Sequence, residues 1–578
     1  MLSLIGRKWT SLLTFTATCL ILFIGFHNLL VPFAPPRPFV HSHVCPATPP
    51  NPPYVPPSKG FSWRKVAAQH PVKSPMGLPR SRPAPLPSVQ HKFQAPSRKA
   101  EAIRRERQAV VRSTFQRAWK SYEDHAWKKD ELRPISGGSK ASFGGWGATL
   151  VDNLDTLLIM NMPEEFDRAV SALDDLDFSP DSAAQGTLNI FEITIRYLGG
   201  FIAAYDLTGC KDPRLLQKAV ELGDMIYASF DTPNRMPITR WSPQKAFNGV
   251  PQYAAAEGII AEMGSSSLEF TRLSQLTGDM RYYDAIARVT NVLDEQQDRT
   301  KLPGMWPVGI DVKTPDLTKG SVFSFGAMAD SAYEYLGKTY QLLGGTGDAA
   351  QYRKLYEGAM STGESLLFRP MVPDNADILL SSVVHAETSL SPTRETSGQH
   401  LTCFVGGMYA LGGRLFNNAT HVSLGQKLTD GCVWLYENSP NGIMPELFSM
   451  AACPHTDDCE WDGGLGGEFF THLADKRYIL RPEAIESVFY LYRITGDQRF
   501  QEVAWDMFQA IEKHTRTPFA NAALRDVMQP NPPQEDSMES FWMAETLKYF
   551  YLVFSEPEMI SLDDFVFNTE AHPFRLPG

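Results

Sequence analysis

Acidic residues occur inside or at the start of helical segments that are otherwise apolar, and their spacing could serve chemistry. In "LNIFEITIRYLGG", Glu192 and Arg196 stand four residues apart and therefore share one face of a helix. When exposed, an ion pair at this spacing stabilises a helix by only about 0.2–0.5 kcal/mol. When buried, the carboxyl group can hold a raised pKa and serve as a general acid. The spacing is compatible with both interpretations.

Further carboxylates stand near the first turns of other predicted helices. They are Asp152 and Asp155 in "GWGATLVDNLDTLLIM", Asp330 and Glu334 in "SFGAMADSAYEYL", Glu483 and Glu486 in "ILRPEAIESVFYLYR", and Glu539 in "DSMESFWMAETLKYF". Each one alone is explained as a helix cap or as a favourable contact with the helix dipole. Their number favours a shared site if the fold brings these helix ends together.

The helices that must position these acids recur at a regular interval. The turns "DLTGCKDPRLL", "QLTGDMRYYDA", "GGTGDAAQYRKL" and "RITGDQRFQEV" resemble one another. They are about 70 residues apart, except for one gap about twice as long, in which "FNNATHVSLGQKL" resembles a degraded copy. Several of the preceding helices are apolar almost all round, which is typical of inner helices in a layered structure. The pattern predicts an all-α, closed α/α barrel, with an open solenoid as the alternative.

In such a barrel, alternate helix ends meet at one rim, and the separate acids would form one pocket. A pocket of this kind can bind a cation or supply the paired carboxylates that cleave a glycosidic bond. The formal net charge of −11 argues against a general nucleic-acid binder, which needs a basic surface. Walker, HExxH and GxSxG motifs do not occur in the sequence, so the chemistries that these motifs indicate have no support.

The chain divides into three parts. Residues 1–31 contain Arg7 and Lys8 before an apolar run, which predicts a cytoplasmic tail and a type II signal anchor, with a cleaved signal peptide as the alternative. Residues 32–100 are rich in proline and lack apolar periodicity, which predicts a lumenal stem that acts as a spacer. Residues 101–578 then form the barrel. A lumenal barrel permits disulfides, and Asn418 in "NNAT" becomes a candidate for N-glycosylation.

The barrel segments also resemble a known family. The blocks that carry the resemblance are "GWGATLVDNLDTL", "IFEITIRYLGG", "LEFTRLSQLTGD", "GAMADSAYEYL", "HLTCF", "LRPEAIESVFYLYR", "SMESFWMAETLKYFYLVF" and "FNTEAHP". Their types and order are similar to class I α-1,2-mannosidases, glycoside hydrolase family 47, from about residue 105 to 575. The resemblance implies an (α/α)7 barrel that a C-terminal β-hairpin closes at one end.

The implied activity is the removal of terminal α-1,2-linked mannose from high-mannose N-glycans of glycoproteins, with inversion and with Ca²⁺, by a monomer. A lectin-like factor that binds these glycans and directs misfolded glycoproteins to degradation is the alternative. By motif position, Glu192 resembles the general acid and Glu483 the base, while Asp330 resembles a third carboxylate that is also a candidate acid. Inversion needs room for a water, so we expect the acid and base carboxyl groups to lie roughly 6.5–9.5 Å apart.

The C-terminal segment "VFNTEAHP" resembles the part of the family that carries the calcium ligand. Thr569 would bind Ca²⁺ directly through its hydroxyl and carbonyl oxygens, and Glu483, Glu539 and Glu570 would hold the waters of the ion. The same resemblance implies further substrate-binding positions, which are Arg196, Met328, His400, Arg481, Glu486, Glu539 and Phe541.

Two further expectations rest on the resemblance. Met328 occupies a position that is arginine in endoplasmic-reticulum members, which stop after one mannose, and leucine in Golgi members, which trim more. Methionine favours a fungal or Golgi-like enzyme with broader trimming, although residence in the endoplasmic reticulum stays open. Cys403 and Cys432 match the disulfide of the family, whereas the states of Cys210, Cys453 and Cys459 stay open.

Overall fold

The computed structural model describes residues 45, 60–79, 85–454, 459, 461 and 468–577. These residues belong to one unit that spans Ser42–Gly578. The predicted signal anchor within residues 1–31 lies outside the described residues. None of the described helices combines the length and the hydropathy needed to cross a membrane.

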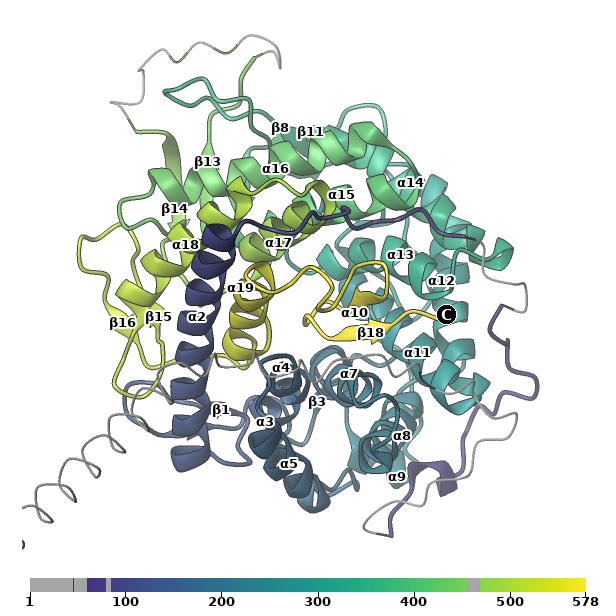
Figure 1. Ribbon diagram of the computed structural model, residues 1–578. Helices are drawn as coiled ribbons and strands as arrows, with labels where there is room; N and C mark the ends of the chain where they lie inside the picture. The colour runs from purple at the N-terminus through teal and green to yellow at the C-terminus, as the bar shows by residue number, and fades with distance from the viewer. Residues whose placement is uncertain are drawn as a thin grey trace, which may run out of the picture. The chain divides into compact units, whose positions relative to one another are not determined.

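A ring of inner helical segments is wrapped by outer helices (Figure 1). The inner segments are α3 (Ala148–Asp152) with α4 (Leu154–Ile159), α6 (Ile190–Glu192) with η3 (Ile193–Leu198) and α7 (Gly199–Leu207), α10 (Ile260–Gly264) with α11 (Ser267–Thr277), α13 (Asp330–Leu342), α15 (Phe404–Leu415), α17 (Glu483–Thr495), and η8 (Trp542–Thr546) with α19 (Leu547–Val553). The outer helices are α2 (Arg98–His125), α5 (Pro163–Ala172), α8 (Pro213–Ala228), α12 (Met280–Gln296), α14 (Ala350–Gly363), α16 (Ala419–Asn438) and α18 (Arg499–Thr515).

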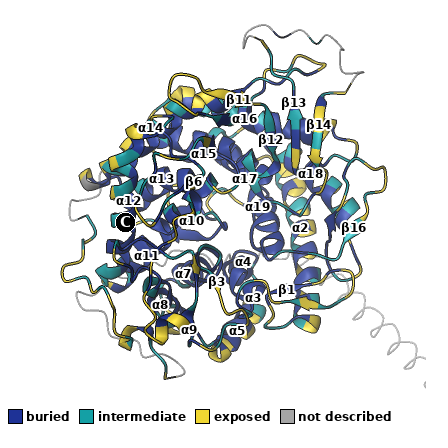
Figure 2. Cartoon of the chain, turned by 180° about the vertical axis from the view of Figure 1, so that it is seen from behind, coloured by how far each residue is buried: buried dark blue, intermediate teal, exposed yellow. Residues whose placement is uncertain are grey.

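Packing between neighbours closes the ring. Each of the first six inner segments contacts the next inner segment and the outer helix that follows it. The last inner segment, η8 with α19, contacts α2 and α3, which joins the two ends. The inner helices α13 and α17 are buried on almost every side, whereas α18 buries one apolar face only (Figure 2). The molecule is therefore the predicted (α/α)7 barrel, and the open solenoid is excluded.

The repeated turns join an inner helix to an outer helix. Gly278 ends α11 with a φ of 73°, a left-handed conformation that glycine adopts without strain. Asp279 then caps α12 by accepting the N–H of Arg281 at 3.1 Å. In the degraded copy, Asn418 caps α16 by accepting the N–H of His421 at 3.2 Å. Asn418 supplies a capping oxygen, as Asp279 does in its own turn. This fifth turn is therefore present in the fold although its sequence does not match the repeated motif.

A short β-hairpin enters the ring along its axis. Strands β17 (Phe565–Phe567) and β18 (Pro573–Arg575) pair antiparallel, with Phe567 opposite Pro573. They contact α13 and α7, and Figure 1 shows the hairpin in yellow inside the ring. The five residues of its turn, from Asn568 to His572, are thereby carried into the barrel, as the resemblance implied.

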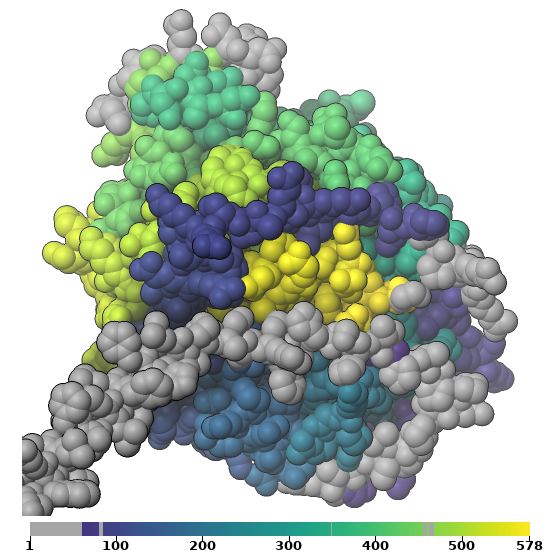
Figure 3. Space-filling model, in the orientation of Figure 1, coloured from purple at the N-terminus to yellow at the C-terminus, as the bar shows by residue number. Residues whose placement is uncertain are grey.

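The described part of the predicted stem does not act as a free spacer. Residues 60–79 and 85–97, here called the N-terminal belt, lie against the barrel (Figure 3). Trp63 is 5% exposed, donates its indole N–H to the carbonyl of Phe178 at 2.7 Å and packs on Trp241. These residues bury apolar side chains against the barrel, which the proline content of the sequence obscured.

Carboxylates of the barrel fix the backbone of the N-terminal belt. Asp231 accepts the N–H groups of residues 69 and 70 at 2.6 and 2.8 Å. Asp284 accepts that of residue 76 at 2.9 Å, and Asp563 accepts those of residues 89 and 90 at 2.6 and 3.2 Å. These backbone N–H groups of a proline-rich segment without regular secondary structure are thus satisfied by side chains far away in the sequence.

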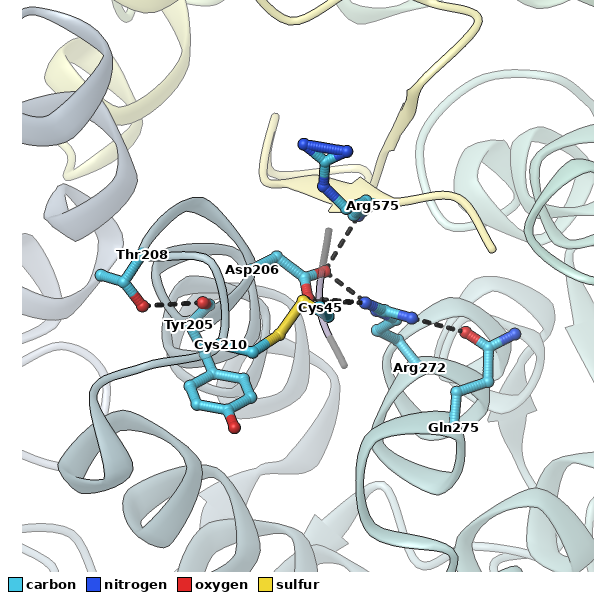
Figure 4. Close-up of a disulfide and its surroundings, with 8 residues drawn as sticks. All are labelled: Cys45, Tyr205, Asp206, Thr208, Cys210, Arg272, Gln275 and Arg575. Atoms are coloured by element: carbon cyan, nitrogen blue, oxygen red, sulfur yellow. Dashed lines mark hydrogen bonds and ion pairs between the residues drawn. A yellow bond between two sulfur atoms is a disulfide. The ribbon is translucent and has the colours of Figure 1, made fainter. Parts of the chain in front are cut away.

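Three disulfides occur among the described cysteines. Cys403 and Cys432 are joined, as the resemblance implied. Cys453 and Cys459 form a second bridge, and Cys45 and Cys210 form a third, whose states the sequence left open. Figure 4 shows the third bridge beside Asp206, which binds Arg272 at 2.7 Å and accepts the backbone N–H of Arg575 at 2.9 Å. The two sulfurs and the carboxylate lie close enough to suggest a metal site, but bonded sulfurs offer no thiolate ligand.

Candidate active site

Glu192 and Arg196 lie where the inner wall departs from α-helical geometry. Arg196 belongs to η3, a π-helical turn that follows Glu192 directly, and such turns are frequent at functional sites. The guanidinium Nε donates to Glu192 Oε2 at 2.9 Å. Arg196 is 5% exposed and stacks on the ring of Phe143 at 4.4 Å, whereas Glu192 stays partly exposed. The pair is therefore neither a surface ion pair nor fully buried.

The second arm of Arg196 reaches the hairpin turn. Its Nη1 binds Glu570 Oε1 and also donates to Ser540 Oγ at 3.1 Å. Ser540 in turn donates to Asp152. One guanidinium thereby links carboxylates from α3, α6 and the C-terminal hairpin, which are far apart in the sequence. Burial and the neighbouring carboxylates of Asp152 and Glu192 raise the pKa of Glu570 well above its ordinary value, although Arg196 opposes them.

Glu483 begins α17 between two basic groups. Arg481 Nη1 lies 3.4 Å from one carboxylate oxygen, and His400 Nδ1 lies 3.8 Å from the other. Burial alone would raise the pKa of Glu483, but Arg481 and His400 lower it below its ordinary value. The guanidinium group of Arg481 also forms an ion pair with the carboxylate of Glu446. The backbone carbonyl of Glu446 accepts the N–H of His400 at 2.9 Å, so one residue positions both basic groups. Glu483 is thus kept ionised, as a general base requires.

Asp330 begins α13 in the opposite electrostatic setting. Burial, with the nearby carboxylates of Glu334 and Glu483, raises the pKa of Asp330 to about 7. Farther along this part of the wall, Lys338 binds Glu334 and lies 3.8 Å from Glu486. Two carboxylates with pKa values shifted in opposite directions are the usual signature of an acid and base pair.

Two other predicted positions line the same region. Phe541 is 6% exposed and packs beside the Arg196 guanidinium at 5.8 Å. Burial raises the pKa of Glu539 although Arg196 opposes the shift. Both residues therefore lie near Arg196, which binds the hairpin turn.

Met328 differs from the other predicted positions because it is 56% exposed. It precedes α13 with a φ of 74°, and its carbonyl accepts the N–H of Ala261 at 3.1 Å. A methionine rarely adopts this left-handed conformation, so the loop holds the residue in a strained backbone geometry with its side chain exposed. This placement suits contact with a ligand outside the buried carboxylates.

Three buried residues were missed by sequence reasoning. Glu545 is 5% exposed in η8, and burial together with Glu570 and Glu483 raises its pKa well above the ordinary value. Glu269 in α11 and Asn568 in the hairpin turn are fully buried and bonded to each other at 2.8 Å. Each glutamate interrupts an apolar helix in the sequence, which is the signal that singled out Glu192 and was available here as well.

The donor set fits a hard cation. The carboxylates of Asp152, Glu483, Glu539, Glu545 and Glu570 gather near the guanidinium groups of Arg196 and Arg481. Burial, with repulsion from neighbouring carboxylates, raises the pKa values of Glu539, Glu545 and Glu570. Oε2 of Glu483 is buried without a hydrogen-bond partner. Thr569, with its hydroxyl and carbonyl oxygens, stands partly exposed in the hairpin turn beside Glu570. Oxygen donors and excess negative charge are what Ca²⁺ requires.

Comparisons with known proteins agree with this arrangement. Residues 114–576 match the family Glycosyl hydrolase family 47. A mannosyl-oligosaccharide 1,2-alpha-mannosidase of Arabidopsis thaliana is 35% identical over 484 residues, covering 82% of this chain and 80% of that protein. The endoplasmic reticulum mannosyl-oligosaccharide 1,2-alpha-mannosidase of Homo sapiens is 36% identical over 481 residues, covering 81% and 64% respectively.

Among solved structures, the alpha-1,2-mannosidase from Trichoderma reesei is similar with a TM-score of 0.74 and 30% identity, over 82% of this chain and 99% of that one. The family match over residues 114–576 spans the positions of the hairpin and of the carboxylates described above. The chain belongs to glycosyl hydrolase family 47.

Proposed function

We propose that the chain is an inverting exo-α-1,2-mannosidase that removes terminal α-1,2-linked mannose from high-mannose N-glycans of glycoproteins. The observation that carries the proposal is the contrast between Glu483 and Asp330. Arg481 and His400 keep Glu483 ionised, while burial keeps Asp330 protonated up to a pH of about 7. The names of the relatives, which are mannosyl-oligosaccharide 1,2-alpha-mannosidases, support the substrate class.

The carboxylates divide the reaction between them. Glu483 accepts a proton from water while the water oxygen bonds to the anomeric carbon from the face opposite the leaving group. The glycosidic C–O bond breaks, and its oxygen receives a proton from Glu192, acting through a water, or from Asp330. Attack from the opposite face inverts the anomeric configuration. We expect the acid and base carboxyl groups to be roughly 6.5–9.5 Å apart.

The remaining residues bind and orient. Thr569 would hold Ca²⁺ through its hydroxyl and carbonyl oxygens, and Glu483, Glu539 and Glu570 would hold its waters. When bound, the ion supplies positive charge and coordination for sugar hydroxyl groups. Arg196, Arg481, His400, Glu486 and Phe541 complete the sugar-binding wall. The intact set of carboxylates argues against a lectin that only binds glycans.

The cellular setting is part of the proposal. Relatives that carry an endoplasmic-reticulum designation and the three disulfides support an enzyme of the secretory pathway. We propose a monomer with a type II anchor at its N-terminus and a lumenal barrel in the Golgi or endoplasmic reticulum membrane, glycosylated at Asn418. A mature N-terminus beyond residue 30 would contradict the anchor.

The decisive experiment measures mannose release from a Man9 glycan and the configuration of the mannose first formed. We expect β-mannose as the initial product, loss of activity in EDTA and recovery with Ca²⁺. Glu483→Gln should lower kcat about 10²–10⁴-fold, because the amide cannot accept the proton of water. Glu502→Gln, which changes an exposed acid in the first turn of α18, is the matched control and should leave kcat unchanged. Activity that survives both EDTA and Glu483→Gln would defeat the proposal.

Specificity is tested at Met328. The wild type should trim several mannose residues, because an exposed methionine offers no charge to hold one glycan arm. Met328→Arg should slow trimming beyond the first mannose, so that a Man8 product accumulates. Accumulation of a single Man8 isomer by the wild type would contradict broad, Golgi-like trimming.

A further inference from the structure

The hairpin turn that carries Thr569 is held by a hydrogen-bonded cluster behind it. Asn568 accepts the N–H groups of Glu570 and His572 through Oδ1 at 3.0 and 2.8 Å, which folds the turn on itself. Its Nδ2 donates to the carbonyl of Ile195 at 3.0 Å and to Glu269 at 2.8 Å. The turn is therefore braced internally, and Asn568 ties it to two inner helices.

Thr569 has a different tether. Its backbone N–H donates to the hydroxyl oxygen of Tyr335 at 3.2 Å, and this hydroxyl donates its proton to Glu269 Oε1 at 2.7 Å. Because the hydroxyl proton is committed to Glu269, a lone pair is left facing Thr569. Tyr335 and Glu269 are 1% and 0% exposed, so bulk water does not replace either partner.

We propose that Tyr335 is a positioning residue that fixes Thr569 for Ca²⁺ binding, with Glu269 orienting its hydroxyl group. The proposal rests on the proposed function, because it assumes that Thr569 is the calcium ligand. The hydroxyl and carbonyl oxygens of Thr569 lie only a few bonds from the nitrogen that Tyr335 holds. A ligand contributed by one residue at the end of a hairpin depends on this tether, since a single backbone rotation would move both oxygens.

The same helix provides a matched control. Tyr333 lies two residues earlier in α13 and is 0% exposed. Its hydroxyl also donates one hydrogen bond and accepts one, but both partners belong to Trp306, at 2.7 and 2.9 Å. Replacing either tyrosine by phenylalanine removes the same atom and the same number of bonds. Only Tyr335→Phe changes the support of Thr569.

The first experiment measures the apparent Kd for Ca²⁺ by calorimetry or by the thermal shift of the purified protein. Loss of the hydrogen bond to the N–H of Thr569 should weaken Ca²⁺ binding by Tyr335→Phe about two- to tenfold, with kcat recovering at saturating Ca²⁺. Tyr333→Phe should match the wild-type Kd. Equal Kd values for the two variants would overturn the role of Tyr335 and leave the proposed function intact. Absence of Ca²⁺ binding by the wild type would overturn the calcium part of the proposed function, and this inference with it.

A second experiment needs no metal. In EDTA, amide hydrogen exchange of the peptide that spans residues 565–575 should be faster in Tyr335→Phe than in Tyr333→Phe, because the amide of Thr569 has lost its acceptor. Unchanged exchange would also overturn the inference. Glu269→Gln, which keeps an oxygen acceptor but removes its charge, should shift Kd and exchange in the same direction by a smaller amount. This variant provides the answer if Tyr335→Phe does not fold.

Discussion

At the scale of single residues, the site depends on carboxylates whose surroundings push their pKa values apart. Burial, Glu334 and Glu483 raise the pKa of Asp330 to about 7, so its proton is present below this pH and lost above it. If Asp330 donates or shares the proton of catalysis, kcat/KM should fall about tenfold per pH unit above pH 7. Glu483 has a lowered pKa, so it should stay ionised and act as a base even at pH values somewhat below 4.5, the ordinary pKa of a glutamate.

A pH profile of kcat/KM at saturating Ca²⁺ checks this prediction. Asp330→Asn, which cannot ionise, should be much less active, and what activity remains should not decline above pH 7. A wild-type rate that stays level to pH 9 would show that Asp330 does not control the reaction.

Residue types in the sequence identified the candidate acid and base residues but not the contacts between them. Glu192, Asp330 and Glu483 could be selected because acids interrupt apolar helices. That Arg196 would bind Glu570 could not be predicted, because the two residues are 374 positions apart in the chain and meet only when the hairpin enters the ring. Glu269 and Glu545 carried the same signal and were missed, since each could equally have been an ordinary partner of a nearby cation.

At the scale of elements, the fit between the hairpin and the inner wall depends on a glycine. A Cβ atom on Gly199 would lie 2.6 Å from Asn568 Nδ2 and 2.7 Å from His572 Cδ2. Gly199→Ala should therefore displace the hairpin turn and lower the free energy of unfolding by about 1–3 kcal/mol. It should also weaken Ca²⁺ binding, because Thr569 follows Asn568.

Gly337 in α13 is the matched control for Gly199. A Cβ atom there would lie 3.6 Å from the ring of Tyr356, an ordinary contact. Gly337→Ala should therefore keep Ca²⁺ binding and raise the free energy of unfolding by up to about 1 kcal/mol, since alanine favours the helix. Urea unfolding with Ca²⁺ titration measures both effects, and equal behaviour of the two variants would refute the close approach at Gly199.

Elements with a local signal were predictable, and elements fixed by distant partners were not. The turn at Thr277 contains its own helix stop and cap, Gly278 and Asp279, so its role follows from neighbouring residues. The π-helical turn at Arg196 has no comparable pattern, because its apolar spacing is that of any buried helix. The hairpin was anticipated through family resemblance and not through its strands, which are only three residues long.

At the scale of the whole molecule, the N-terminal belt makes the folded unit larger than the barrel. Its backbone is bound by Asp231 and Asp563, which are more than 300 residues apart, and this explains why local composition predicted a spacer instead. The belt binds outer helices, the chain beyond α19 and the C-terminal end of α17, where residue 91 donates its N–H to the carbonyl of Arg493 at 2.7 Å. None of its bonds described above involves Thr569 or Glu483. Its contribution should therefore be to stability and not to catalysis.

A shortened chain separates these contributions. A protein that begins at residue 98 loses the burial of Trp63, which alone is worth about 3–5 kcal/mol for truncation to alanine, and leaves Asp231 and Asp563 without their backbone donors. The control begins at residue 60 and therefore keeps the belt, and both proteins carry Cys210→Ser because neither contains Cys45. We expect the shorter protein to unfold at a clearly lower urea concentration than the control, while kcat at a temperature where both are folded stays within about twofold. Equal unfolding midpoints would show that the belt contributes nothing to stability. A loss of kcat without a loss of stability would show that the belt affects the active site. Equal midpoints would support the prediction that this segment acts as a spacer, because its contacts with the barrel would then add no stability.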